Sequence, residues 1–288
     1  MDEKDWRILQ SIYQEGSITK AAERLYISQP ALTYRIKQLE EAFNVRILLR
    51  GKKGVEFTPE GNYLVQYASK MLADLRKTKE HLENMDNNIK GTLRLGVASI
   101  FARYELPEIL SNFLKLYPEI EIVLKTGWSA DMHSMLQKEE AHVGIIRGNY
   151  NWSGKKYLLN EEKLFVVSKN EINIDKLPTL SRINYKTDLT LKSLTDYWWQ
   201  ETFDTPPNYT MEVDRIDTCI EMVLNGLGFA VVPEISLKGY DQLHRIEVLP
   251  KNNNEFSRKT WMIFHENSLE LSIVRAFVDF LLTQKTND

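Results

Sequence analysis

Apolar residues recur every three or four positions through residues 1–90, and this spacing predicts a run of amphipathic helices. A first helix is expected over residues 4–14, and Ser17 and Ser28 stand where they can cap two further helices. Pro30 fits the first turn of the third helix, because the N–H that proline lacks has no helical partner there. The buried stripe of that third helix consists of Leu32, Ile36 and Leu39. The pattern therefore predicts two helices that meet at a tight turn.

The residues expected on the outer face of these two helices are hydrogen-bond donors, small residues and cations, which is what a helix in the DNA major groove presents. They are Thr19, Ser28, Gln29, Pro30, Thr33, Tyr34, Arg35 and Lys37. A hairpin wing is expected around Gly51–Gly54, where Arg50, Lys52 and Lys53 can meet phosphate. Residues 17–58 carry eight Lys/Arg and four Asp/Glu, a net charge of +4 in a chain of net charge −3. We predict that residues 1–58 bind double-stranded DNA; the alternative is a helical domain with a solvated charged face.

Residues 59–90 contain no internal Pro after Pro59 and predict one long helix with a narrow apolar stripe. The stripe alternates spacings of four and three and consists of Leu64, Ala68, Met71, Leu75, Thr78, Leu82, Met85 and Ile89. Such a stripe can pack on its own domain or on a second copy of the same helix. Because it is self-complementary, we expect it to form a homodimer.

From residue 91 onward, strand and helix patterns alternate, which predicts α/β architecture with parallel strands. The alternation divides into two halves and suggests two lobes with a cleft between them. The first lobe is expected to comprise residues 91–162 and 265–288, and the second lobe residues 163–264. Ligands of such sheets bind at the carboxyl ends of the strands, beside helix N-termini.

The loops at these strand ends, with the first residues of two later elements, contain hydroxyl groups and two arginines. The candidate ligand residues are Ser99, Ile100, Ser129, Arg147, Thr218 and Arg258. Guanidinium groups and helix N-termini suit a carboxylate, and several such groups together suit a small polycarboxylate. For each residue taken alone, the alternative is an ordinary surface ion pair or helix cap.

Composition narrows the classes of function. The chain of 288 residues has one cysteine, Cys219, which excludes an intrachain disulfide and fits a reducing cytoplasm. No apolar run approaches about 20 residues, so neither a membrane span nor a signal peptide is expected. No nucleophile elbow, phosphate loop, dinucleotide fingerprint or metal-ligand cluster occurs, so we predict neither catalytic nor metal-binding residues, and no cofactor. An enzyme built on the two lobes, and a purely architectural DNA-binding protein, are the competing interpretations.

The chain resembles the LysR-type transcriptional regulators over nearly its whole length. In the N-terminal part the matching residues are Ser17, Ala21–Ala22, Leu25, Ser28–Leu32, Ile36, Leu39–Glu40, Arg50, Thr58–Pro59 and Gly61. In the C-terminal part they are Leu106–Pro107, Tyr117–Pro118, Val143–Ile145 and Asn225–Pro233. The resemblance implies an α+β multidomain chain: a winged helix-turn-helix, a dimerising linker helix and a periplasmic-binding-protein-like (type 2) effector domain. It also implies a homodimer, with a dimer of dimers as the further expectation.

Several segments are similar, within that family, to the citrate-responsive catabolite control proteins C and E of low-GC Gram-positive bacteria. They are GVASIFARYELPEIL, TGWSADM, VGIIRGNYNW, DRIDTCIEMVLNGLG and RKTW. The likeness implies that Arg147 and Arg258 hold citrate, that Ser99 and Ser129 support it, and that the targets are tricarboxylic-acid-cycle genes. A regulator that senses another small organic acid or an amino acid, and controls a different set of genes, is the alternative.

Overall fold

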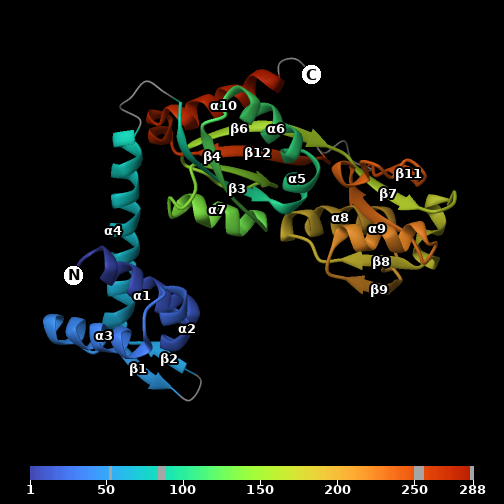
Figure 1. The fold of residues 1–288 in the computed structure, drawn as a ribbon. Coiled ribbons are helices and arrows are strands. Elements are labelled where there is room, and N and C mark those ends of the chain that lie inside the picture. Colours follow the sequence, from blue (N-terminus) through green and yellow to red (C-terminus); the bar gives the residue numbers. More distant parts are fainter. Residues whose placement is uncertain (52–53, 84–88, 250–255, 286–288) are drawn as a thin grey trace. The chain divides into compact units, whose positions relative to one another are not determined.

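The computed structural model describes residues 1–51, 54–83, 89–249 and 256–285 (Figure 1). The chain divides into two compact units, residues 1–85 and residues 86–288, which are described separately. Among the described residues, no helix is both long and apolar enough to cross a membrane.

The first unit begins with three helices whose starts are fixed by short polar side chains. Asp2 and Asp5 form a reciprocal capping box at the first helix. Ser17 Oγ accepts a hydrogen bond from the Lys20 N–H (3.4 Å), and Ser28 Oγ accepts one from the Ala31 N–H (3.3 Å). The two serine caps lie where the sequence predicts them, whereas the Asp2–Asp5 box was not predicted. The three helices are α1 (Glu3–Glu15), α2 (Ile18–Arg24) and α3 (Gln29–Phe43).

A two-stranded antiparallel wing and a long helix complete the first unit. They are β1 (Leu48–Gly51), β2 (Gly54–Phe57) and α4 (Pro59–Glu83). The Thr58 hydroxyl joins them, because it donates to the Arg46 carbonyl (2.6 Å) and accepts from the Gly61 N–H (2.9 Å). Gly61 is required here, since a Cβ at this position would lie 2.2 Å from the Ile47 carbonyl oxygen.

The apolar stripe predicted for residues 59–90 is divided between different environments. Leu64 and Ala68 are buried in the core of the first unit. This part of the stripe therefore packs on its own domain, which was one of the two alternatives. Leu82, further along α4, is 59% exposed. Ile89 has no helical backbone and packs against the core of the second unit, so the prediction of one helix through residue 89 was wrong at that residue. Met85 lies outside the described residues.

The first lobe of the second unit is built on a five-stranded mixed sheet in the order β4-β3-β5-β12-β6. Strands β3, β4 and β5 are parallel, and β12 is antiparallel to β5 and β6. Helices α6 and α10 pack together on one sheet core through Phe113 and Phe277, whereas α7 covers a separate core through Met132 and Leu136. The strands are β3 (Gly91–Ala98), β4 (Ile120–Gly127), β5 (Val143–Arg147), β6 (Lys155–Glu162) and β12 (Arg258–Phe264). The helices are α5 (Ser99–Tyr104), α6 (Leu106–Leu116), α7 (Ser129–Gln137), η3 (Glu266–Glu270) and α10 (Ser272–Lys285).

The position of β12 corrects the predicted lobe boundary. The prediction placed residues 163–264 in the second lobe, but β12 pairs with β5 from Thr260↔Arg147 to Phe264↔Val143. Its alternating apolar residues, including Met262 and Phe264, enter the first-lobe core. The chain therefore returns to the first lobe before β12, which lies between β5 and β6 as an inner strand of the central sheet.

The second lobe packs two helices against opposite sides of its strands. Cys219, Ile220 and Val223 of α9 form one core, and Leu191, Trp198 and Trp199 of α8 form the other. A three-stranded antiparallel sheet (β10-β7-β11) lies beside a parallel pair (β8-β9). The strands are β7 (Leu164–Ser168), β8 (Arg182–Tyr185), β9 (Tyr209–Val213), β10 (Ala230–Pro233) and β11 (His244–Glu247). The helices are η1 (Ile174–Thr179), α8 (Leu189–Thr202), α9 (Ile216–Leu224) and η2 (Glu234–Leu237).

A buried carboxylate fixes α3 against α1 in the first unit. Asp5 has no exposed side-chain surface, and Arg35 of α3 donates to its two oxygens from Nε (2.5 Å) and Nη2 (2.9 Å). Removal of the guanidinium would leave a buried charge without its main partner, which costs far more than loss of a surface ion pair.

We expect Arg35→Ala to increase local opening of the first unit. Amides of α1 and α3 should exchange hydrogen for deuterium about tenfold faster in the full chain, because the Asp5 carboxylate loses charge-assisted hydrogen bonds. Lys37→Ala, which removes an exposed cation from the same helix, is the matched control and should leave exchange unchanged. Equal exchange in wild type and Arg35→Ala would contradict the structural role of the pair.

Candidate functional site

The predicted DNA-contacting residues of the first unit lie mostly at its surface. Thr19, Ser28, Gln29, Pro30, Tyr34 and Lys37 are exposed, and Thr33 is half-buried. Gln29 Nε2 donates to Thr33 Oγ1 (3.0 Å), so these two side chains are already oriented relative to each other along α3. The arrangement presents amide, hydroxyl and cationic groups around the N-terminal half of one helix, where base edges and phosphates would meet them.

Arg35 differs from its neighbours because its guanidinium is held by Asp5. The hydrogen bond to Asp5 and its charge raise the pKa of Arg35. Sequence reasoning placed this residue on the DNA-facing side of α3. In the structure, its ion pair with Asp5 of α1 fixes the position of α3. Arg50 lies in β1, but its side chain is outside the described residues, as are Lys52 and Lys53.

The second unit contains a pocket of about 280 Å³ between its two lobes. First-lobe residues line it at the carboxyl ends of β3, β4 and β5, and second-lobe residues line it at the starts of α8 and α9. Five of the six predicted ligand residues line this pocket: Ser99, Ile100, Ser129, Arg147 and Arg258. Thr218 is not among the lining residues; Ile216 and Asp217, at the start of the same helix, face the pocket instead.

Arg147 is a buried cation at the end of β5. Its side chain is 3% exposed and forms an ion pair with Glu162, which is equally buried. Burial lowers the pKa of Arg147 to about 9, and the nearby Arg258 charge adds to that effect. The Ser129 hydroxyl accepts from the Arg147 N–H (2.9 Å), which fixes the backbone of β5 against the start of α7.

Arg258 lies next to Arg147 because β12 begins where β5 ends. Its guanidinium donates to the Arg147 carbonyl (3.4 Å), to Asp188 and to the Thr190 hydroxyl. Asp188 also caps α8 by accepting from the Thr190 and Leu191 N–H groups (3.0 Å each). Burial raises the pKa of Asp188, but Arg258 and these hydrogen bonds outweigh burial, and the net pKa is lowered.

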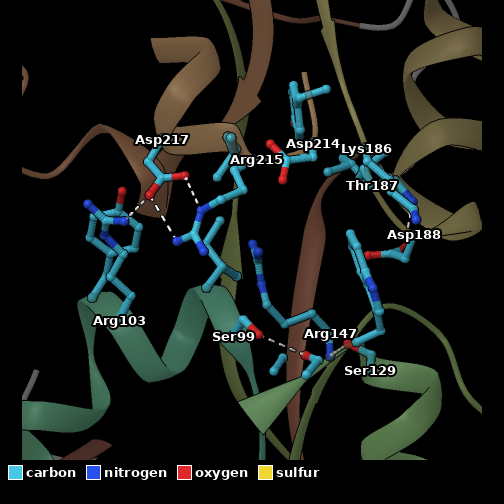
Figure 2. A pocket seen from close by; sticks show the side chains of 18 of the residues that line it. Ser99, Arg103, Ser129, Arg147, Lys186, Thr187, Asp188, Asp214, Arg215 and Asp217 are labelled. Atoms are coloured by element: carbon cyan, nitrogen blue, oxygen red, sulfur yellow. Dashed lines mark hydrogen bonds and ion pairs between the residues drawn. The ribbon is translucent and has the colours of Figure 1, made fainter. Parts of the chain in front are cut away.

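A second group of charges connects the lobes at the more exposed side of the pocket. Asp217 of α9 accepts from Arg215 (3.0 Å) and from Arg103 of α5, so one carboxylate lies between two guanidinium groups (Figure 2). The hydrogen bonds from Arg215 and the charge of Arg103 hold the pKa of Asp217 at about 2. Lys238 and Glu105 form another ion pair between the lobes (2.6 Å).

The pocket has a positive charge balance that suits an anion. Its lining includes five Lys/Arg and three Asp, a net charge of +2. Sequence reasoning missed three of the cations, Arg103, Lys186 and Arg215. Arg103 could have been predicted from the sequence, because it follows the candidate residue Ser99 by one helical turn. Lys186 and Arg215 come from the second lobe and reach the pocket only through tertiary folding.

Cys219 and His142, whose side chains belong to types that can act as a nucleophile or a metal ligand, are both buried. The Cys219 thiol is fully buried, and burial raises its pKa to about 12, so it lacks the thiolate character of a nucleophile. His142 is 8% exposed, and its Nδ1 accepts from the Arg94 N–H (3.2 Å). Within the described parts of the chain, His, Cys, Asp and Glu form no group able to hold a metal ion.

Two family models together match nearly all of the chain. The model described as LysR substrate binding domain matches residues 86–286. The model described as bacterial regulatory helix-turn-helix protein, lysR family, matches residues 4–62.

Curated relatives agree with these matches over their full length. The uncharacterized HTH-type transcriptional regulator YraN of Bacillus subtilis (strain 168) is 43% identical, covering 98% of this chain and 97% of that protein. The uncharacterized HTH-type transcriptional regulator YkuM of the same organism is 35% identical, with the same coverage. The HTH-type transcriptional regulator CzcR of Bacillus subtilis is 26% identical over 99% of this chain and 98% of its own.

Solved structures share the fold along the whole chain. Full-length CbnR complexed with its target DNA matches with a TM-score of 0.71 at 16% identity, covering 98% of this chain and 99% of that chain. The full-length virulence activator AphB of Vibrio cholerae matches with a TM-score of 0.63 at 19% identity, covering 98% of this chain and 99% of that chain. These likenesses confirm the predicted arrangement of a winged helix-turn-helix, a long helix and a two-lobed α/β domain. From its domain matches and its full-length relatives, the chain belongs to the LysR family and is a DNA-binding transcriptional regulator rather than an enzyme.

Proposed function

We propose that a small carboxylate, with citrate as the specific candidate, binds in the pocket between the lobes and controls binding to operator DNA. The observation that carries this proposal is the set of five cations around the pocket, two of which are the buried residues Arg147 and Arg258. Each of these arginines already has one carboxylate partner, and a ligand carboxylate can accept further hydrogen bonds because a guanidinium presents five N–H donors.

The internal ion pairs leave some donors of the two buried arginines without an acceptor. The buried Nε atoms of Arg147 and Arg258 have no hydrogen-bond partner among the described residues. Toward the exposed side, Arg103, Lys186 and Arg215 can meet further carboxylate groups of one ligand. Three carboxylates of citrate would match cations at both depths, and so would other di- or tricarboxylic acids. A different small acid or an amino acid is therefore the alternative effector.

The ion pairs between the lobes suggest how binding could change the protein. Arg103 belongs to the first lobe and Asp217 to the second, so a ligand carboxylate near Arg103 competes with Asp217. A ligand changes the population of two lobe arrangements only if it binds one of them more tightly. We infer that an acid that shifts the Arg103–Asp217 contact favours one arrangement and thereby changes the geometry of the DNA-bound oligomer.

Dimerisation through α4 and control of tricarboxylic-acid-cycle genes are the remaining parts of the proposal. The exposed side of α4 carries Leu82, and Met71 and Leu75 are half-buried, which leaves apolar surface for a second copy. A dimer would place two α3 helices on two half-sites, and a dimer of dimers would bring in further sites. A regulator of bacterial chromosomal DNA would act in the cytoplasm.

We expect the double variant Arg147→Gln/Glu162→Gln to lose the ligand response. The neutral pair avoids an unpaired buried charge but removes charge-assisted bonds, so citrate affinity should fall by about tenfold or more in calorimetry. Operator binding without ligand should persist. Lys115→Gln, which neutralises an exposed cation of α6, should change neither property. Heat from a different acid, with none from citrate in the wild-type protein, would favour the alternative effector.

Residues on α3 should differ in how they affect DNA binding. We expect Gln29→Ala to reduce discrimination at one base pair by about 1–3 kcal/mol, because an amide can form paired hydrogen bonds with a base edge. Lys37→Ala should weaken binding to all sequences alike and lower the salt-dependence slope by about 1. Duplexes selected in vitro by the wild-type protein supply the targets. Equal discrimination by Gln29→Ala and wild type would remove Gln29 from base contact.

We expect Leu75→Asp to convert dimers into monomers in sedimentation experiments. A carboxylate in a shared apolar stripe would be desolvated without a partner. Lys70→Asp places the same charge on an exposed position of α4 and is the control. A dimer that survives Leu75→Asp would place the interface elsewhere.

A further inference from the structure

A second pocket lies entirely within the second lobe of the effector domain. Its volume is about 250 Å³, and α8, β8 and β9 supply most of its lining. Its polar lining includes Arg182, Asn184, Lys192, Thr195, Asp196 and Glu212, none of which lines the pocket between the lobes. The two pockets share Tyr185–Thr187 and Leu191 as a common wall.

Arg182 is the unusual residue in this second pocket. It is 5% exposed, and its guanidinium has no ion pair or hydrogen bond to the described part of the chain; the buried Nη1 is left without an acceptor. The faces of Trp199 and Tyr209 flank it, each with its ring centroid 5.1 Å from the guanidinium carbon. Aromatic faces attract a cation but offer its N–H groups no oxygen or nitrogen acceptor. The donors of Arg182 therefore remain available to a ligand.

Arg182 differs from the other two buried arginines discussed above in that it forms no ion pair with a described carboxylate. Arg147 has Glu162, and Arg258 has Asp188, within ion-pair distance. Asp196 is close enough to stabilise the charge of Arg182 but forms no ion pair with it. Burial lowers the pKa of Arg182, which means that its charged form is held in the lobe at a cost. An acceptor from outside the chain would remove part of that cost.

We propose that Arg182 forms a second anion site, within the second lobe, that takes the carboxylate of a small organic acid with a single negative charge. The charge balance favours a monoanion, because the lining holds three Lys/Arg and two Asp/Glu, a net charge of +1. Asp196 and Glu212 would repel a second carboxylate. Thr195 is buried and also lines this pocket. Its hydroxyl donates its proton to the Lys192 carbonyl (2.9 Å), so toward a ligand it can act only as an acceptor.

Ligand-detected NMR on the full-length protein tests this site with acetate, propionate and pyruvate as probes. Wild type should give a saturable signal for at least one of the three acids below about 10 mM, as expected for a fragment that meets one buried guanidinium. Arg182→Met should weaken that binding by about tenfold or more. Thr195→Met keeps Arg182 but fills the pocket with an unbranched side chain, and it should abolish the same signal.

Two control variants separate this site from the pocket between the lobes. Lys176→Met removes an exposed cation of η1, which lines neither pocket, and should change affinity by less than about threefold. Arg147→Gln/Glu162→Gln should leave monocarboxylate binding intact while citrate affinity falls by about tenfold or more. Far-UV circular dichroism and thermal unfolding of the Arg182→Met and Thr195→Met proteins report whether they remain folded.

Three results would overturn the proposal. They are the absence of saturable binding by all three acids in wild type, unchanged binding in folded Arg182→Met or Thr195→Met, and loss of monocarboxylate binding only in the Arg147→Gln/Glu162→Gln protein. The last result would assign these acids to the pocket between the lobes. A failure of citrate to bind wild type, by contrast, would affect only the proposed effector.

Discussion

The effector domain depends on the neutralisation of two buried guanidinium groups. Arg147 and Arg258 lie side by side at the end of the central sheet, where each charge disfavours the other. Glu162 and Asp188 make this arrangement possible by supplying one carboxylate to each arginine. These partners also hold the backbone, because Glu162 accepts from the Ile235 N–H (2.7 Å) and Asp188 caps α8. The same four charges therefore hold two guanidinium groups at the pocket and join the two lobes.

In the first unit a charge is also buried and paired, but there the buried charge is negative and its partner is positive. Asp5 is the fully buried charge, and the partly exposed Arg35 reaches it from α3. In both units, a long cationic side chain from one element satisfies a carboxylate of another, so that helix position depends on a charge pair as well as on apolar packing. Arg182 departs from this pattern because two aromatic rings flank its guanidinium, and it forms no ion pair with a carboxylate of the described residues.

Local patterns in the sequence predicted the helix caps, the hairpin and the strand ends, since each depends on a few adjacent residues. Ser17 and Ser28 cap their helices, and Ser129 and Arg147 meet at the predicted edge of the sheet. Properties set by distant residues were not predictable in this way. The strand at residues 258–264 has a clear pattern, but only pairing shows that it belongs to the first lobe. Likewise, no residue near Arg35 indicates that its partner lies thirty residues earlier. Thr218 does not line the pocket because the preceding residues of α9, Ile216 and Asp217, face it instead.

The contact at Gly61 has a mechanical consequence. The first turn of α4 touches the Ile47 carbonyl at the foot of the wing with no side chain between them, and the Thr58 hydroxyl ties both segments together. With backbone against backbone there is no rotamer that could absorb a small displacement. We therefore expect a twist of α4 about its own axis to move β1 and β2 with it, so that the wing and the long helix turn together.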